Sequence, residues 1–302
     1  GGGFIGGLVA VAGSSLLAIL FDPQLARKYQ PLTPLKLAML GVALAVLAGV
    51  IASGFREPRE LTVEQIEQDL LLSRLIIELA NDDYLGYELV FRGGTCLHKL
   101  HAPKPLRYSE DLDYVRSTAG GIRELTRAVT QIGKRLGMEV RTRIGEHPKV
   151  FLRAPYETGV GQMRIKIEVN FERSPARPPI RIPYRVESSW FTGGADVLTF
   201  ALDEVVATKI RALFQRSKGR DLFDLWLALT RLGVPASSVV EAFSAYRPEG
   251  YTRHRAELNL REKAKRSAYR EDIRPLVTTW PEGYDIEAAT ELVIADVLTL
   301  ID

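Results

Sequence analysis

Asp111-Leu112-Asp113 decides the predicted fold, because it places two carboxylates two positions apart at the start of a segment predicted as a strand, residues 111–116. Side chains at positions i and i+2 of a strand point to the same face, so Asp111 and Asp113 share one face while Leu112 points to the core. Two like charges so close repel each other unless a cation lies between them. Hard divalent cations such as Mg²⁺ are bound by one or two carboxylates together with substrate phosphates. A lone Asp-x-Asp also occurs often on protein surfaces, so this pair needs support from the rest of the chain.

A second predicted strand, residues 163–172, offers a third carboxylate. Its apolar and polar residues alternate strictly, which places Ile165 and Ile167 on the buried face and Lys166 and Glu168 on the other. If this strand lies beside the Asp-x-Asp strand, Glu168 joins the two aspartates on one face, and three carboxylates can hold two metal ions. The alternative is a half-exposed strand with no chemical role.

Gly93-Gly94-Thr95 lies between a predicted buried strand, residues 89–91, and a short helix. Two glycines let the backbone approach a phosphate closely, and a helix N-terminus offers free N–H groups. The segment matches neither GxxxxGK[ST] nor GxGxxG, and an isolated turn of this kind is more often structural. Its place before Ser109 and the carboxylate pair makes it a candidate phosphate-binding turn.

Residues 205–220 contain five basic side chains and no acidic one. Lys209 belongs to a predicted helix, residues 202–215, at the edge of its apolar stripe, and Asp221 opens the next one, residues 222–232. We expect the Lys209 ammonium to reach a cleft and contact a triphosphate, with Asp221 as the partner that orients it. The alternatives are a solvated basic helix face and an aspartate that only caps its helix.

The amino-acid composition argues against several classes of protein. The chain has 302 residues, 46% of them hydrophobic and 25% charged, which suits two small globular domains. A net charge of +3 gives no overall basic field. The single cysteine, Cys96, excludes an intrachain disulfide and a cysteine-based zinc site, and we expect it to pack as a small apolar residue behind the glycine turn. The four scattered histidines form no HExxH motif, which argues against a zinc enzyme.

The first 55 residues have a different composition from the rest. Two apolar runs, residues 4–21 and 35–55, have 18 and 21 residues, close to the ~20 needed to cross a bilayer. We expect residues 1–55 to form an apolar helical hairpin in the inner membrane, with the catalytic part in the cytoplasm. The alternative is that this segment does not belong to the native enzyme, which would then be fully cytoplasmic. After a charged linker, residues 56–60, we predict an α/β domain over residues 56–200 and a helical domain over residues 201–302, an α+β class.

The motifs together resemble the AbiEii family, nucleotidyltransferase-like toxins of type IV toxin–antitoxin (abortive infection) systems in bacteria. The resemblance covers the chain from about Val63 to its end and rests on five segments in the family's order. These are Phe91-Arg92-Gly93-Gly94-Thr95, Arg107-Tyr108-Ser109-Glu110-Asp111-Leu112-Asp113, Lys166-Ile167-Glu168-Val169-Asn170, Thr208-Lys209-Ile210-Arg211-Ala212 and Lys218-Gly219-Arg220-Asp221-Leu222-Phe223-Asp224. It implies a polymerase-β-like nucleotidyltransferase fold followed by a helical domain. The family pattern has no apolar hairpin at its start, so residues 1–55 depart from it.

The resemblance also implies roles for single residues. The nucleoside triphosphate would be bound by Gly93, Gly94, Thr95, Ser109 and Lys209; Mg²⁺ or Mn²⁺ would be bound by Asp111, Asp113 and Glu168; and Lys209 and Asp221 would match the family's later essential lysine and aspartate. Some relatives transfer nucleotides onto the acceptor end of tRNA. The implied partners are therefore a nucleoside triphosphate, an RNA acceptor, and a cognate antitoxin that acts with or without direct contact. Two other functions stay open: a transferase that modifies a protein or small molecule, and a non-catalytic module tethered to the membrane.

Overall fold

The computed structural model describes residues 62–302 except 103, 105, 119–120, 144, 146–147 and 171–174. The hairpin predicted over residues 1–55 and the linker over residues 56–60 lie outside the described residues. Within the described part of the chain, no helix is long and apolar enough to cross a membrane. All described residues fall in one compact unit. The predicted domain boundaries, including the one at residue 200, stay predictions.

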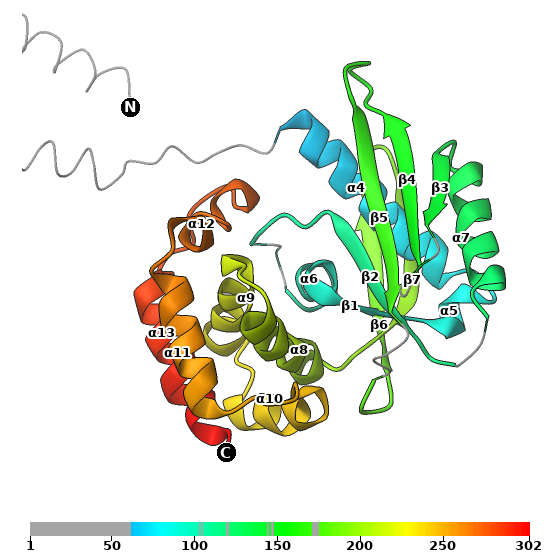
Figure 1. Cartoon of the computed structure of the whole chain (residues 1–302). Coiled ribbons are helices and arrows are strands. Elements are labelled where there is room, and N and C mark those ends of the chain that lie inside the picture. Colours follow the sequence, from blue (N-terminus) through cyan, green and yellow to red (C-terminus); the bar gives the residue numbers. More distant parts are fainter. Residues whose placement is uncertain are drawn as a thin grey trace, which may run out of the picture. The chain divides into compact units, whose positions relative to one another are not determined.

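A mixed seven-stranded sheet forms the first half of this unit (Figure 1). Its spatial order is β3-β4-β5-β2-β1-β7-β6. The strands β2 and β5 pair in parallel, as do β1 and β7, and the other neighbours are antiparallel. The strands are β1 (Leu89–Arg92), β2 (Asp111–Arg116), β3 (Glu139–Arg143), β4 (Lys149–Pro155), β5 (Gln162–Asn170), β6 (Ile180–Glu187) and β7 (Thr192–Thr199).

Helices α4 (Val63–Ala80), α5 (Leu85–Glu88) and α7 (Arg123–Arg135) belong to the sheet half, with α4 packed on β5 and β7 and α7 on β3 and β4. The predicted capping box starts α4: the Thr62 hydroxyl accepts from the Gln65 backbone N–H, and the Gln65 side chain accepts from the Thr62 N–H. Leu72 of α4, Leu112 of β2 and Ile167 of β5 are fully buried. The face of β2 and β5 that carries Leu112 and Ile167 is therefore the core face, and the carboxylates of both strands point away from it.

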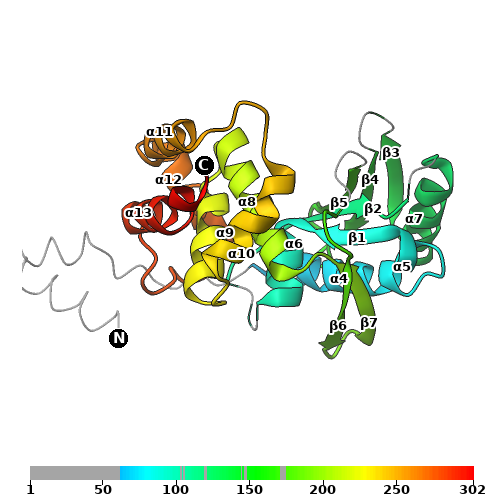
Figure 2. The ribbon, with the colours of Figure 1, turned by 90° about the horizontal axis from the view of Figure 1, so that it is seen from below.

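Helices make up the second half of the described chain (Figure 2). Between β1 and β2 the backbone forms α6 (Gly93–Cys96) and the π-helix η1 (Leu97–His101). After β7 come α8 (Leu202–Gln215), α9 (Gly219–Thr230), α10 (Ala236–Phe243), η2 (Ser244–Tyr246), α11 (Arg253–Ala264), α12 (Ser267–Arg270), η3 (Arg274–Leu276), α13 (Ile286–Asp296) and η4 (Leu298–Leu300). Helix α9 is buried at every residue from Asp221 to Ala228 and contacts α8 and α13. It is the centre of the helical half, and the mixed α+β class predicted from the sequence is confirmed.

The β6–β7 hairpin has no counterpart among the predicted elements. The signal for β6 was present in the sequence, because Ile180, Ile182, Tyr184 and Val186 alternate with polar residues or proline. Pro183 interrupts this run, and a proline cannot donate to a ladder, which argues against a central strand. It is tolerated here because β6 is the edge strand of the sheet and pairs only with β7.

Candidate active site

The parallel pairing of β2 and β5 builds the carboxylate face. In the register of the two strands, Asp111 lies opposite Lys166, and Asp113 lies opposite Glu168. The strand that carries Asp111 and Asp113 is therefore the neighbour of the strand that carries Glu168, as a shared site requires. Paired residues on adjacent strands point to the same face of a sheet, so the three carboxylates share one face, away from the core.

Two lysines partly neutralise this face. The Lys166 ammonium lies 2.9 Å from Asp111 Oδ2 and 3.1 Å from Glu168 Oε2, and the Lys149 ammonium lies 3.4 Å from Glu168 Oε2. Burial alone would raise the pKa of Glu168, but the hydrogen bonds from Lys166 and Lys149 outweigh it and lower that pKa. Lysine therefore relieves part of the repulsion that the sequence analysis assigned to a metal cation alone.

The glycine turn lies against the second aspartate. Gly93 has a φ of +86°, a left-handed conformation that side chains rarely adopt, and a Cβ on it would lie 2.7 Å from Asp113 Oδ2. A Cβ on Gly94 would lie 2.4 Å from Arg107 Nη2. Both positions therefore require glycine. Desolvation raises the pKa of Asp113, because the turn and the sheet shield this carboxyl from water.

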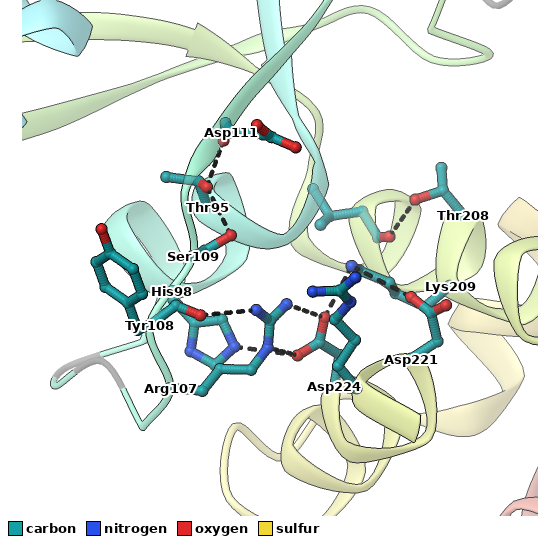
Figure 3. Close-up of polar contacts among 12 residues, drawn as sticks. Thr95, His98, Arg107, Tyr108, Ser109, Asp111, Thr208, Lys209, Asp221 and Asp224 are labelled. Atoms are coloured by element: carbon teal, nitrogen blue, oxygen red, sulfur yellow. Dashed lines mark hydrogen bonds and ion pairs between the residues drawn. The ribbon is translucent and has the colours of Figure 1, made fainter. Parts of the chain in front are cut away.

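Thr95 and Ser109 connect the turn to the start of β2 (Figure 3). The buried Thr95 hydroxyl donates to the Asp111 carbonyl oxygen at 2.5 Å. The Ser109 hydroxyl lies 2.8 Å from the same Thr95 hydroxyl. The Thr95 hydroxyl thus fixes the backbone of Asp111. That this turn binds a nucleotide stays a prediction. Gly93 and Gly94 are partly exposed, whereas Thr95 is buried, so the glycine backbone is the part of the turn that a nucleotide can reach.

Asp224 is the centre of a buried polar cluster that joins α9 to α8 and to the segment before β2 (Figure 3). It accepts two hydrogen bonds of 2.7 Å from Arg107, forms an ion pair of 2.7 Å with the Lys209 ammonium, and lies 3.0 Å from His98 Nε2. Asp221 accepts two hydrogen bonds of 2.7 Å from Arg216, and its Oδ1 lies 3.8 Å from the Lys209 ammonium, which is also within ion-pair distance. The predicted partner Asp221 is thus present, but Asp224, which was not predicted, is the nearer one.

The cations around Asp224, together with burial, set the charge of the titratable groups in this cluster. Burial alone would raise the pKa of Asp224, but Arg107 and Lys209 outweigh it and hold that pKa well below the ordinary range. Burial lowers the pKa of His98, so this imidazole is neutral near pH 7. Three cations (Arg107, Lys209, Arg216) then surround two carboxylates (Asp221, Asp224), which leaves one positive charge in excess.

A cavity of about 210 Å³ separates the carboxylate face from α8. Asp113 and Glu168 line one side, while Lys209, Arg211 and Arg216 of the basic stretch line another. The full lining is Arg92, Gly93, Gly94, Asp113, Tyr114, Glu168, Asn170, Thr208, Lys209, Arg211, Ala212, Gln215 and Arg216. Asp111, Thr95, Ser109 and Asp221 are not among the residues that line the cavity. The remaining basic residues of the stretch, Lys218 and Arg220, pair with Asp272.

Sequence reasoning missed Asp224, Arg107, His98 and Arg92 as members of the site. One signal was available: Asp221 and Asp224 are three positions apart on α9, a spacing that places both on the same side of a helix. Arg107 also stood in the quoted segment before the aspartate pair. Cys96 is buried with its Sγ 3.1 Å from Thr199 Oγ1, so its predicted packing behind the turn is confirmed.

The donor chemistry of the carboxylate face suits a hard divalent cation, although it does not form a complete cage. In the part of the chain that the structure describes, no three His, Cys, Asp or Glu side chains are arranged to hold a metal ion. Asp113 lines the cavity and has no lysine or arginine within ion-pair distance among the described residues, whereas Asp111 and Glu168 share Lys166. Mg²⁺ usually takes only one or two carboxylates and completes its shell with water and substrate phosphates. The residues present fit that pattern.

Residues 74–291 match the family model described as nucleotidyl transferase AbiEii toxin, type IV toxin–antitoxin system. The match covers well over half of the chain. The chain belongs to the AbiEii family. It is therefore a nucleotidyltransferase of a toxin–antitoxin family, and the resemblance seen in the motifs is confirmed.

Two solved structures are similar to this chain. MenT4, a nucleotidyltransferase toxin from Mycobacterium tuberculosis H37Rv, is 21% identical and has a TM-score of 0.55, over 79% of this chain and 85% of that one. JHP933 from Helicobacter pylori is 17% identical with a TM-score of 0.49, over 80% of this chain and 93% of that one. None of the curated proteins matches the chain.

The N-terminal part of this AbiEii-family chain has a second similarity. Residues 1–94 match a model described as a domain related to the MnhB subunit of Na⁺/H⁺ antiporters. That match covers less than a third of the chain and overlaps the AbiEii match over residues 74–94.

Proposed function

We propose that this AbiEii-family nucleotidyltransferase is a metal-dependent toxin that transfers a nucleotide from a nucleoside triphosphate to the 3′-hydroxyl of an RNA, with tRNA as the acceptor class. One observation carries the proposal: a single cavity has carboxylates from β2 and β5 on one side and cations from α8 on another. A carboxylate-bound metal and a fixed cation are the two devices that stabilise a transferring phosphoryl group.

The cations of α8 and the glycine turn bind the triphosphate in this proposal. Lys209 is held in place by Asp224, and the cluster around it keeps one positive charge in excess of its carboxylates. That excess suits an anionic ligand. Gly93 and Gly94 line the cavity without side chains, so their backbone can approach a phosphate closely.

Asp111 and Asp113 are the residues that would hold Mg²⁺ or Mn²⁺, with Glu168 as the third carboxylate. When bound there, the metal offsets the negative charge of the phosphates and lowers the pKa of the attacking hydroxyl. Gly93 keeps the space beside Asp113 Oδ2 open for ligands. Thr95 fixes the backbone of Asp111, so the two carboxylates keep their spacing along β2.

The reaction needs no nucleophilic side chain. The acceptor 3′-oxygen forms a bond to the α-phosphorus, the bond between that phosphorus and the oxygen bridging to the β-phosphate breaks, and pyrophosphate leaves. The hydroxyl proton passes to solvent. Lys209 and Arg216 offset the added negative charge of the transition state. Cys96 is buried and Ser109 is bonded to Thr95, so neither is a candidate for covalent catalysis.

Location and partners complete the proposal. We place the catalytic part in the cytoplasm, where nucleoside triphosphates and tRNA are found, with an antitoxin encoded beside it as the regulator. Residues 1–55 attach the enzyme to the inner membrane. Their two apolar runs and the similarity of residues 1–94 to a subunit-related domain of a membrane antiporter support this attachment.

The test is a labelling assay with purified full-length protein, radiolabelled nucleoside triphosphates and two acceptor pools, bulk cell RNA and bulk cell protein. We expect the label at RNA 3′ ends, dependent on Mg²⁺ or Mn²⁺. Asp113→Asn should lower the rate at least 100-fold, since removal of one preorganised charge-stabilising group costs on the order of 10²–10³ in rate. The matched control is Glu110→Gln, an exposed acid in the same segment that does not line the cavity, and it should keep the wild-type rate. Label in protein alone would overturn RNA as the acceptor, and full activity in Asp113→Asn would remove the carboxylates from the mechanism.

A further inference from the structure

One face of β3, β4 and β5 continues the carboxylate face without interruption. Across the strands, Arg143 is in register with Lys149, Lys149 with Glu168, and Glu168 with Asp113. A second row runs in the same way from Arg141 through Phe151 and Lys166 to Asp111. Residues in register on neighbouring strands share a face, so this surface leads directly to the carboxylates. We call it the basic sheet face.

The basic sheet face carries six basic side chains and two acidic ones from β3, β4 and β5. The basic residues are Arg141, Arg143, Lys149, Arg153, Arg164 and Lys166, and the acidic residues are Glu139 and Glu168. Glu168 pairs with Lys149 and Lys166, and Glu139 pairs with Arg141 at 2.8 Å. Among the described residues, Arg143, Arg153 and Arg164 have no carboxylate partner. Their charge is thus left for a ligand.

The other face of the same strands is closed. Val150, Leu152 and Ile165 are buried there, and α4 and α7 pack on that side of the sheet. In Figure 1, α4 lies behind β5, and none of the drawn helices lies in front of β4 and β5. The basic sheet face is therefore the solvent-exposed side, with Arg141, Arg143 and Arg164 exposed.

An aromatic ring lies among these cations. The Arg164 guanidinium stacks over the Phe151 ring, 4.5 Å from its centroid. Flat aromatic and guanidinium groups are the surfaces on which unpaired bases stack in single-stranded RNA. A patch of cations with a stacked ring suits a nucleic acid strand better than an acidic protein, because only the former offers both phosphates and bases.

We infer that the basic sheet face binds the RNA strand whose 3′ end enters the cavity. The inference rests on the proposed function and names the surface that holds the acceptor. Neighbouring strands are about 4.8 Å apart, so the face extends roughly 14 Å from β2 to β3. The phosphates of the bound strand run along this distance. Arg143, Arg153 and Arg164 bind those phosphates, and Phe151 with Arg164 supports a base.

The experiment compares two triple variants of the full-length chain that each remove three positive charges. The test variant is Arg143→Gln with Arg153→Gln and Arg164→Gln; the control is Arg123→Gln with Arg127→Gln and Lys134→Gln. The control residues are exposed on α7, which packs on the opposite face of β3 and β4. The probe is bulk deacylated tRNA. We expect the test variant to raise the KM for tRNA about tenfold and to flatten the salt dependence of tRNA binding by about two to three units of slope.

Three measured quantities separate this surface from the chemistry. The KM for the nucleoside triphosphate, the kcat at saturating tRNA and the melting temperature should stay at wild-type values in both triple variants. A test variant with the wild-type KM and salt slope for tRNA, in a wild-type protein that labels tRNA, would overturn the inference and leave the proposed function intact. An equal loss in the control variant would also overturn it, since overall charge would then explain the effect. A wild-type protein that labels no RNA would instead overturn the proposed function itself.

Discussion

At the residue scale, Lys209 shows what the sequence can and cannot predict. Its place on a helix with an apolar stripe predicted a buried stem and an ammonium in a cleft, and the structure places Lys209 4% exposed in the cavity lining. Its predicted partner, Asp221, lies 3.8 Å from the ammonium, but the nearer partner, Asp224 at 2.7 Å, was not predicted. Asp221 and Asp224 share one side of α9, so the sequence offered two equal candidates. Only the position of Arg216, which takes Asp221, leaves Asp224 for Lys209.

The first residue-scale prediction is that Lys209→Ala slows nucleotide transfer about 10- to 100-fold. It removes a charge-assisted contact to the triphosphate, and such contacts contribute about 1.5–3 kcal/mol. Lys209→Arg should restore the rate only partly, because a planar fork does not replace a compact point charge. The matched control is Lys218→Ala, which removes a lysine paired with Asp272 outside the cavity lining.

Transfer rates and Mn²⁺ affinity of the Lys209 and Lys218 variants check this assignment. Mn²⁺ affinity should stay at the wild-type value in all of them, because Lys209 does not pair with Asp111, Asp113 or Glu168 in the described structure. Wild-type transfer by Lys209→Ala would contradict a role in phosphate binding. Loss of Mn²⁺ binding would show that the lysine supports the carboxylates instead.

At the scale of single elements, the sequence predicted those with a strong apolar period. The strand over residues 111–116 and the helix over residues 202–215 have the same limits in the structure. The hairpin β6–β7 was missed although apolar residues alternate along β6, because Pro183 within the run argues against a strand. The π-helix η1 was missed as well, because its five residues are too few to show a helical apolar period.

Helix α8, which carries Lys209, is held at its end by another element. Lys263 of α11 donates to the carbonyl oxygens of Leu213 and Phe214 at 2.6 and 3.0 Å. These belong to the last turn of α8, where carbonyls have no partner within the helix. Lys263 is 5% exposed, and burial lowers its pKa to about 8.

We expect Lys263 to make the free energy of unfolding rise with pH above 8. In the unfolded chain a lysine has a pKa near 10.4, so between about pH 8 and 10.4 the unfolded state binds more protons than the folded state. The free energy of unfolding therefore increases with pH across this range, and Lys263 contributes no more than roughly 3 kcal/mol to the increase. The neutral amine still donates to the α8 carbonyls, so the contact survives. Lys263→Met should abolish the rise.

Melting temperatures at pH 7, 8.5 and 10 for the wild type and Lys263→Met measure this effect, because other titrating groups cancel in the difference between the two proteins. Lys265→Met, an exposed lysine two positions further along the chain, serves as the control. A wild-type-minus-variant difference that stays constant from pH 7 to 10 would rule out the lowered pKa of Lys263.

At the scale of the whole molecule, the order of the strands lay beyond sequence reasoning. Alternation showed that Glu168 and the two aspartates each lie on the polar side of a strand. Asp113 and its register partner Glu168 are 55 positions apart in the sequence, and they become neighbours only in the folded sheet, where β2 and β5 pair in parallel. The buried cluster of Arg107, Lys209 and Asp224 likewise joins three distant segments. Long-range pairing depends on the combined packing of all elements, which no local pattern contains.

The last prediction concerns the division of the chain, and we expect a chain that starts at Glu60 to fold and to transfer nucleotides at the full-length rate. The described residues form one compact unit, and the capping box of α4 begins at Thr62, so this cut leaves the described unit and its capping box in place. A second chain that starts at Ser73 is the control. It loses the cap, the buried Leu72 and the hydrogen bond from Gln68 to the Arg164 carbonyl oxygen, and should melt lower by several degrees.

Melting temperature, transfer rate and membrane fractionation are compared for all three chains. Only the full-length chain should sediment with membranes. A chain from Glu60 that aggregates would place the boundary elsewhere, and full-length protein absent from the membrane fraction would contradict the proposed attachment through residues 1–55.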